Sequence, residues 1–308
     1  MFGFTLKQLR YIEAAARTGS IASAAGELNI SQSSITAAID KFEEDLGYAL
    51  FIRVPAKGIS TTPSGEEAMK LIRGFIDGAR HLESDMRSVG GKTTGTLRLG
   101  CYATSAPQVL PRLLKGFIRD YPAISIQIFE GDLRSVTEFL ENGEVDIALT
   151  YDLTRSDHQR FEPLFEAPAH AVLPSDDPLA EQESVSPAEL AQRPMVLLDL
   201  PRAREYFMEL FAHHGLTPRV VHSARSAEIA RALVAGGFGF TILNIRYAEQ
   251  DGTRQDFVMR PISDQRFFPV FGMASMADAR QPRIVEAFLA HCRELAAQRV
   301  FDEIVVRP

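Results

Sequence analysis

The sequence predicts a protein of the α/β class in three parts: a small helical head, one long helix and a larger α/β body. In the head, residues 5–65, apolar side chains recur at helical spacing and are separated by short polar breaks. Residues 64–89 carry an apolar seam in heptad spacing, which indicates one long helix. From residue 96 onward, strands alternate with helices, and this order is typical of a parallel, doubly wound sheet.

Two helices form the centre of the head. A first helix is expected over residues 5–17, and an alanine-rich helix over residues 21–28 ends at Asn29. Ser31 is placed to cap the next helix, which ends at Gly47. The outward face of that helix begins with short polar side chains, where a helix-turn-helix protein contacts base edges: Gln32, Ser33, Ser34 and Thr36. Taken alone, this pattern also fits an ordinary helical hairpin with a solvated polar face.

A β-hairpin is expected directly after these helices. Residues 48–58 predict a short strand, a turn and a returning strand. This hairpin would hold Arg53 and Lys57 as a basic wing beside the second helix. The run Thr61-Thr-Pro-Ser-Gly65 then predicts the start of the long helix, with proline near its first turn.

A known family shows the same landmarks. The matching residues are Leu6–Ala15, Gly19-Ser20, Ala24-Ala25, Leu28, Ser31–Thr36, Ile39, Glu43, Leu46-Gly47, Leu50–Arg53 and Thr62–Gly65, and in the body Gly131, Asp146–Thr150 and Ser226–Leu243. With them the chain resembles the LysR-type transcriptional regulators, densely over residues 1–65 and less densely to the C-terminus. The resemblance implies a winged helix-turn-helix head, a long linker helix and a two-lobed, periplasmic-binding-protein-like effector domain. It also implies a dimer or tetramer on promoter DNA, with RNA polymerase as a further partner.

The DNA contacts are expected from one short set of side chains: Ser31, Gln32, Ser33, Ser34, Thr36, Arg53 and Lys57. Many members of the family have a basic or long polar side chain directly after the position of Thr36. This chain has Ala37 there, so base recognition must depend on the polar side chains that remain.

Composition limits the classes of function. The chain has 308 residues, 45% of them hydrophobic and 24% charged, as expected for a globular protein of two or three domains. Its net charge is −7, yet residues 1–92 carry eleven basic and eleven acidic residues. DNA affinity must therefore come from local placement of basic groups and from more than one head. Because the sequence has neither a secretory signal nor an apolar stretch that could cross a bilayer, we expect a cytoplasmic protein with no membrane partner.

The long helix predicts self-association. Its seam consists of seven residues spaced alternately four and three apart: Ala68, Ile72, Phe75, Ala79, Leu82, Met86 and Val89. We expect that so small a head cannot bury this stripe and that a second copy covers it. A dimer would present two recognition helices to a roughly palindromic operator. The alternative is an amphipathic helix packed on the second domain of the same chain.

The body predicts two lobes. Expected strands of the first lobe cover residues 96–101, 124–129, 146–150 and, after a return of the chain, 268–273, with helices over 107–120, 132–142 and 282–297. Expected strands of the second lobe cover residues 195–198, 219–222 and 239–243, with helices over 204–213 and 226–235. The expected domains are 1–62 for the winged head, 63–92 for the linker helix and hinge, and 93–308 for the effector domain. Its lobes comprise about 93–164 plus 266–308, and 165–265.

The cleft between the lobes is the expected ligand site, because open α/β sheets bind ligands at the carboxyl ends of their strands. With the resemblance, this placement predicts eight effector-binding residues: Tyr102, Thr104, Ser105, Tyr151, Asp199, Arg202, Ser226 and Asn244. Arg202 is the favoured counter-charge for an anionic effector. For each polar residue, a capping or turn role is the alternative, and for Ser226 it is at least as well supported.

Other classes of protein have weaker support. The seven histidines form no recognised metal or hydrolase signature, and the adjacent His213 and His214 would point apart on a helix. The glycines at 236–239 follow a helix, the reverse of the order in a phosphate-binding loop. Cys101 and Cys292 have no evident basic environment. We therefore expect no enzyme, cofactor or metal, but a regulator responding to a small, anionic metabolite. The alternative is a small-molecule-binding protein or enzyme with an incidental helix-turn-helix head.

Overall fold

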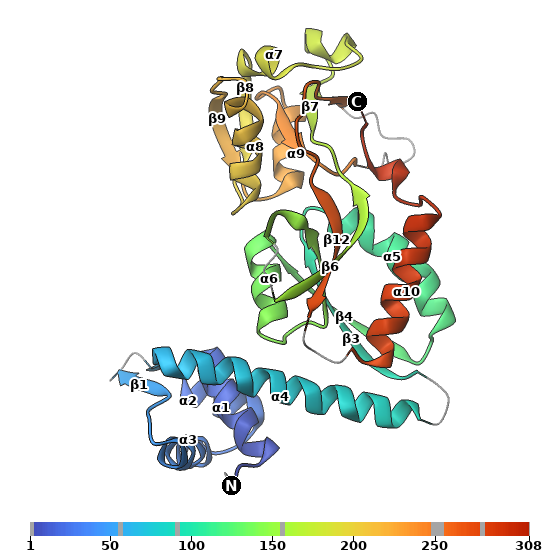
Figure 1. Ribbon diagram of the computed structural model, residues 1–308. Coiled ribbons are helices and arrows are strands. Elements are labelled where there is room, and N and C mark those ends of the chain that lie inside the picture. Colours follow the sequence, from blue (N-terminus) through green and yellow to red (C-terminus); the bar gives the residue numbers. More distant parts are fainter. Residues whose placement is uncertain are drawn as a thin grey trace. The chain divides into compact units, whose positions relative to one another are not determined.

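The computed structural model describes residues 3–54, 58–89, 93–154, 158–247, 256–277 and 281–307 (Figure 1). Backbone contacts group residues 1–86 and 141–143 into one compact unit and residues 87–140 and 144–308 into a second. No helix among the described residues is long and apolar enough to span a membrane.

Three short helices form the head, with limits set by local capping. They are α1 (Leu6–Thr18), α2 (Ile21–Leu28) and α3 (Gln32–Leu46). Thr5 closes a capping box with Gln8 at the start of α1, and Ser31 caps α3, as expected. Gly47 ends α3 in the left-handed conformation, at φ 79°. The helices enclose a core around Leu9, Ile12, Ile35 and Ile39, all of them buried.

The wing is a two-stranded antiparallel hairpin of β1 (Phe51–Val54) and β2 (Gly58–Thr61). Glu43 of α3 fixes the first strand, because its Oε1 accepts hydrogen bonds from the backbone N–H groups of Leu50 at 2.6 Å and Phe51 at 3.0 Å. Thr62 joins the wing to the next helix. Its hydroxyl donates to the carbonyl of Ala49 at 2.8 Å and accepts from the N–H of Gly65 at 2.9 Å. A side chain at Gly65 would lie 2.1 Å from the Leu50 carbonyl oxygen, so glycine is required there.

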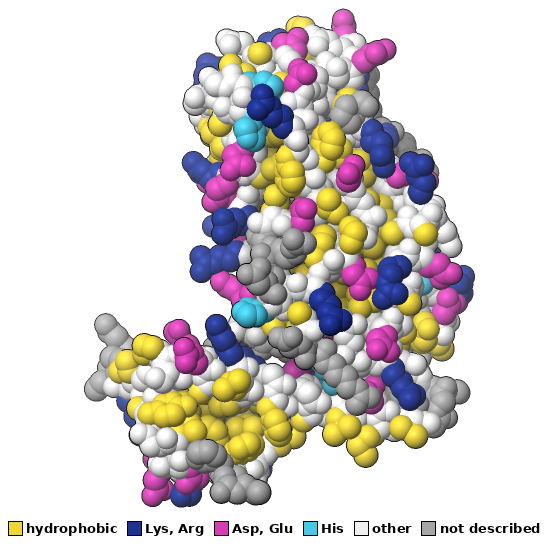
Figure 2. All heavy atoms as spheres, viewed as in Figure 1, with side chains coloured by type: hydrophobic (Ala, Val, Ile, Leu, Met, Phe, Trp, Pro, Cys, Tyr) yellow, Lys and Arg dark blue, Asp and Glu magenta, His cyan; other side chains and the backbone are white. Residues whose placement is uncertain are grey.

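The long helix α4 (Pro63–Ser88) is buried on the head along its first half only. Ala68 and Ile72 of the expected seam, with Met69 and Ile76, belong to the head core. The head therefore buries the first turns of the stripe, and the expectation that it cannot bury this stripe is wrong for these turns. Other apolar side chains on α4 and directly after it remain exposed: Leu71, Phe75, Leu82, Met86 and Val89. Figure 2 shows apolar side chains gathered over the head and continuing along the helix.

The first lobe of the body is built on a five-stranded sheet in the order β4-β3-β5-β12-β6. Its strands are β3 (Gly95–Tyr102), β4 (Ile124–Gly131), β5 (Ile147–Tyr151), β6 (Gln159–Glu166) and β12 (Val270–Met276). Of the four strands expected from the sequence, β3, β4 and β5 are parallel to one another. However, β12 runs antiparallel to β5 and β6, so the sheet as a whole is mixed. The antiparallel direction follows because β12 enters from the second lobe.

Helices cover both faces of this sheet (Figure 1). On one face, α5 (Ala106–Asp120) packs beside α10 (Arg283–Ala297), with Phe117 and Phe288 in edge-to-face contact. On the other face, α6 (Leu133–Glu141) buries Val136 and Leu140 against Ala148 and Ala274.

The second lobe combines two small sheets. Its strands are β7 (His170–Pro174), β8 (Pro194–Leu198), β9 (Arg219–Ala224), β10 (Thr241–Leu243) and β11 (Phe257–Pro261). The order β10-β7-β11 is antiparallel, whereas β8 and β9 are parallel. Its helices are α7 (Pro187–Ala191), α8 (Ala203–Ala212) and α9 (Ala227–Ala235), and short 3-10 helices η1 (Asp152–Thr154), η2 (Pro178–Glu181) and η3 (Asp302–Ile304) complete the body. The sequence did not predict β6, β7 or β11.

Two segments cross between the lobes, residues 167–169 and 262–269, as expected for a hinge. They are hydrogen-bonded to each other: the N–H of Ala167 donates to the Pro269 carbonyl at 2.9 Å, and the Gln265 side chain bonds both backbone groups of Ala169. A third connection follows α10. There the N–H of Arg246 donates to the Ile304 carbonyl at 2.8 Å, so the C-terminal segment also holds the second lobe.

Candidate functional site

The N-terminal end of α3 presents a cluster of hydroxyl groups. Ser31 Oγ accepts from the backbone N–H of Ser34 at 3.2 Å and lies 2.9 Å from Ser33 Oγ and 2.8 Å from Ser34 Oγ. Gln32 and the serines are exposed, while Thr36 is half-buried. The structure therefore gathers the five expected polar residues on the first turns of one helix, four of them freely accessible to a base edge or phosphate.

The wing adds a cation that is already paired. Arg53 on β1 forms an ion pair with Asp40, which lies further along α3, and both side chains are exposed. Sequence reasoning missed Asp40, which places a negative charge beside the basic residue expected to contact DNA. Lys57, the other basic residue expected on the wing, lies outside the described residues.

A pocket lies between the two lobes of the body. It encloses about 260 Å³, counting space open to solvent. The first lobe contributes the last residue of β3 and Thr104 after it. The second lobe contributes residues of α8 and α9, the ends of β8 and β10, and the two residues after β10. Its lining consists of Tyr102, Thr104, Leu198, Phe207, Ala227, Arg231, Leu243, Asn244 and Ile245. Three of the eight expected effector-binding residues therefore line it: Tyr102, Thr104 and Asn244.

Arg231 is the cation of this pocket, and sequence reasoning missed it. It is half-buried on α9, its guanidinium lies 4.4 Å from the ring centre of Tyr247, and burial lowers the pKa of the guanidinium. An arginine remains charged in such surroundings, so the cleft holds a partly desolvated positive charge. Ala227 and Arg231 are four residues apart on α9 and both line the pocket, so one face of this helix borders it.

The polar side chains of the first lobe are neutral groups at the base of this pocket. Burial raises the pKa of Tyr102 to about 12, and its hydroxyl is hydrogen-bonded to Thr104. Burial also raises the pKa of Tyr151, whose hydroxyl lies 3.4 Å from Ser105 Oγ. Ser105 and Tyr151 are buried and lie outside the lining. They support Tyr102, since the rings of Tyr102 and Tyr151 are in edge-to-face contact at 5.8 Å.

Three expected residues of the second lobe also lie outside the lining. Asp199 forms an ion pair with Arg204 at 3.0 Å. Arg202, the favoured counter-charge, is exposed and precedes α8 in an unusual backbone conformation, at φ 67°. Ser226 caps α9, with its Oγ 3.5 Å from the backbone N–H of Ile229. The structure thus gives Ser226 the capping role that the sequence left open.

The two cysteines are buried and free. Burial raises the pKa of both thiols, so they stay protonated at neutral pH. A protonated thiol is a poor nucleophile, and this argues against redox sensing at Cys101 or Cys292.

Comparisons with known proteins agree with this architecture. The profile described as "Bacterial regulatory helix-turn-helix protein, lysR family" matches residues 6–66, and "LysR substrate binding domain" matches residues 90–297. The RuBisCO operon transcriptional regulator of Allochromatium vinosum is 27% identical over 246 residues, covering 80% of this chain and 81% of that protein. The regulator CbbR of Rhizobium meliloti (strain 1021) is 29% identical over 254 residues, covering 82% and 80%.

A solved structure extends the similarity to almost the whole length. HinK, a LysR family transcriptional regulator from Pseudomonas aeruginosa, is 31% identical, with a TM-score of 0.62 over 96% of this chain and 99% of that chain. Both profiles fall where the structure has its winged head and its two-lobed body. The chain therefore belongs to the LysR family of transcriptional regulators, proteins that bind DNA through a helix-turn-helix domain and are not enzymes.

Proposed function

We propose that this regulator responds to a small anionic metabolite bound beside Arg231 in the cleft between its lobes. The carrying observation is the placement of Arg231, a half-buried cation in a pocket that both lobes line. A carboxylate there would satisfy the guanidinium, and Thr104 and Asn244 offer polar partners from opposite lobes. In this proposal Tyr102 forms the base of the site, and Ser105, Tyr151 and Ser226 hold its walls. Asp199 and Arg202 lie outside the lining, so this proposal gives them no contact with the ligand.

The DNA-binding half of the proposal uses the residues expected from the sequence. Ser31, Gln32, Ser33, Ser34 and Thr36 at the start of α3 would enter the major groove, and Arg53 and Lys57 on the wing would contact phosphates. Binding to promoter DNA places the protein in the cytoplasm, with RNA polymerase as a candidate partner. The proposed domain limits are those expected from the sequence: 1–62, 63–92 and 93–308, with lobes of about 93–164 plus 266–308, and 165–265.

The exposed half of the α4 stripe supports self-association. Phe75 is 52% exposed and Leu82 is 56% exposed, which leaves large apolar side chains in water along one helix. A second copy of the helix would remove them from water and would set two recognition helices at a fixed separation. We propose a dimer that pairs further into a tetramer, on an operator that is roughly palindromic.

Ligand and DNA would be coupled through the lobes. An anion bound by groups of both lobes favours their closed arrangement, because only that arrangement brings both sets of contacts to the ligand. A change in lobe angle then alters the spacing of the heads, with a coupling free energy of about 1–3 kcal/mol.

The test compares two arginine variants. The full chain is screened for thermal stabilisation by organic acids, and DNA binding is measured by mobility shift on the promoter beside its gene. Arg231→Gln should weaken binding of the stabilising acid about tenfold or more, as expected for a lost charge-assisted hydrogen bond. Arg202→Gln, on the exposed residue before α8, is the matched control. The assignment to Arg231 would be refuted if both variants lost binding equally, or if neither variant lost binding.

A further inference from the structure

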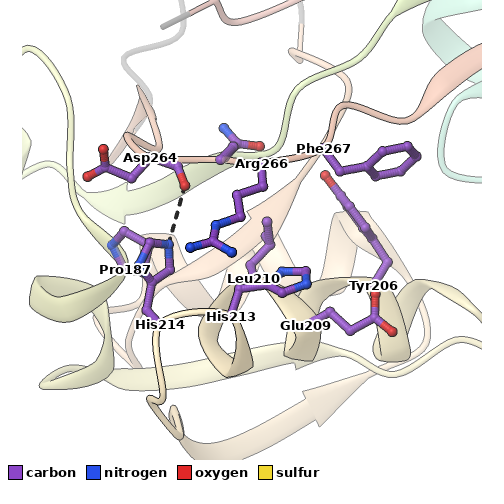
Figure 3. A pocket seen from close by; sticks show the side chains of 10 residues that line it. Pro187, Tyr206, Glu209, Leu210, His213, His214, Asp264, Arg266 and Phe267 are labelled. Carbon is purple, nitrogen blue, oxygen red and sulfur yellow. Dashed lines mark hydrogen bonds between the residues drawn. The ribbon is translucent and has the colours of Figure 1, made fainter.

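A second pocket lies against the hinge, away from the cleft. It is formed by α8 and by residues 264–267 of the second crossing segment, and it shares no lining residue with the cleft. It encloses about 370 Å³, counting space open to solvent. Its lining consists of Pro187, Tyr206, Glu209, Leu210, His213, His214, Asp264, Gln265, Arg266 and Phe267 (Figure 3).

In this pocket the basic side chain of Arg266 and the acidic side chain of Asp264 point in different directions. Figure 3 shows the Arg266 guanidinium pointing inward, over Leu210 and toward the two histidines. The part of the chain that the structure describes gives this guanidinium no hydrogen bond or ion pair. The Asp264 carboxylate points outward, and its backbone carbonyl lies 3.3 Å from His214 Nε2. Arg266 is exposed, and among the described residues it presents to the pocket a cation without an ion pair, in a lining that also contains the Glu209 carboxylate.

Apolar groups form the other wall. Leu210 is buried, and Tyr206 and Phe267 stand in edge-to-face contact at 6.4 Å between ring centres. Glu209 is the acidic residue that α8 contributes to the lining, and it lies below Tyr206 in the view of Figure 3. A metal ion is a poor occupant, because the described residues of the pocket bring no three metal-ligand atoms together. A cation beside an apolar wall suits a compact carboxylate that carries a ring.

The position of the pocket connects it to both the hinge and the cleft. Gln265 bonds Ala169 of the first crossing segment, through its Oε1 at 3.0 Å and its Nε2 at 2.8 Å. Asn244, a lining residue of the cleft, donates from its Nδ2 to the carbonyl of Ala167 at 2.8 Å and lies 3.4 Å from the Tyr206 hydroxyl. A molecule bound against Tyr206 and Gln265 would therefore contact one residue that lies against Asn244 of the cleft and one residue that is hydrogen-bonded within the hinge.

We propose that the pocket between α8 and the second crossing segment is an accessory binding site for a small aromatic carboxylate. Arg266 binds the carboxylate, with His213 and His214 as further polar partners, and Leu210 and Phe267 contact the ring. A bound carboxylate adds contacts between the second lobe and the hinge. The regulator would then respond to a second small molecule, whose binding does not depend on Arg231.

The absence of tryptophan from the sequence allows a direct test. Phe267→Trp gives the full chain a single indole at the pocket, with phenylacetate as the probe. Phenylacetate should change its emission saturably, and Arg266→Gln in the same background should weaken binding about tenfold, as for a lost charge-assisted hydrogen bond. Neutral phenylacetamide should bind correspondingly more weakly. Phe238→Trp, which replaces another exposed phenylalanine of the second lobe, should give no saturable change.

Methyl NMR of the full chain without the indole provides a second readout, should the larger ring obstruct the pocket. Leu210 lines the proposed site and Leu198 lines the cleft, so their methyl signals distinguish binding at the two sites. The variants Leu210→Met and Leu198→Met assign these signals. Phenylacetate should shift the Leu210 signal in both wild type and Arg231→Gln. No shift at Leu210, or binding unaffected by Arg266→Gln, would overturn the proposal while leaving that for the cleft intact.

Discussion

Glu43 should stabilise the winged head more than is usual for a half-buried side chain. Its carboxylate accepts two backbone hydrogen bonds, from the N–H groups of Leu50 and Phe51, which join α3 to the wing. Glu43→Ala removes the acceptor for both N–H groups at buried residues. Each N–H left unpaired costs about 1–3 kcal/mol when water cannot reach it. Partial access of water lowers the sum, so we expect a loss of about 2–4 kcal/mol in the opening free energy of the head.

Native-state hydrogen exchange, read by mass spectrometry on peptides from the head, measures this loss apart from the body. A loss of about 2–4 kcal/mol corresponds to exchange that is roughly 30- to 1,000-fold faster in those peptides. Glu43→Gln should restore most of the protection, because its amide oxygen still accepts.

The adjacent Glu44 is the matched control. Its carboxylate is exposed and pairs only with Lys41, at 3.1 Å, among the described ion pairs. Exposed pairs of this kind contribute about 0–1 kcal/mol, so Glu44→Ala should change exchange in the head little. If Glu43→Ala and Glu44→Ala accelerated exchange equally, the two hydrogen bonds would not be what holds the wing to α3.

Three further variants test other parts of the molecule. Asp40→Asn should release Arg53 for a phosphate, raising DNA affinity severalfold at low salt and steepening its salt dependence by about 0.9 per added contact in a mobility-shift titration. Leu82→Glu should shift the assembly toward smaller species in sedimentation, because it places a charge on the exposed stripe of α4. Burial lowers the pKa of His170 to about 3, so the folded state binds fewer protons than the unfolded state below about pH 6.5. Stability should therefore fall from pH 6.5 toward 3, and His170→Leu should remove up to about 1.4 kcal/mol per pH unit of that slope in urea denaturation.

Features with a local cause could be predicted from the sequence. The caps at Thr5 and Ser31 and the left-handed stop at Gly47 depend on residues within one turn, and the structure has all three. The strands β6, β7 and β11 were not predicted. Pro163 lies within β6 and cannot donate a hydrogen bond, and β7 is fixed by partners much later in the chain.

The ligand-facing cation shows why a site is harder to predict than a fold. Arg202 lies in the short segment between β8 and α8, near the strand end that open α/β sheets favour for ligand contacts. The chain instead turns at Arg202 into α8 with a positive φ, and the side chain is exposed. Arg231 lines the pocket because α9 presents that face to the cleft, which depends on how the helix packs on β7 and β8. A pattern of residues does not contain that packing.

The charge of the head points to how a metabolite could control binding. Residues 1–92 have no net charge, and Arg53 is already paired with Asp40, so one head gains little electrostatic energy from DNA. Affinity must then depend on several heads bound at once, each raising the effective concentration of the next. That gain is lost when the spacing of the heads no longer matches the spacing of the half-sites. A modest change in lobe angle would therefore alter DNA affinity strongly, whereas a single strongly basic head would stay bound regardless of the ligand.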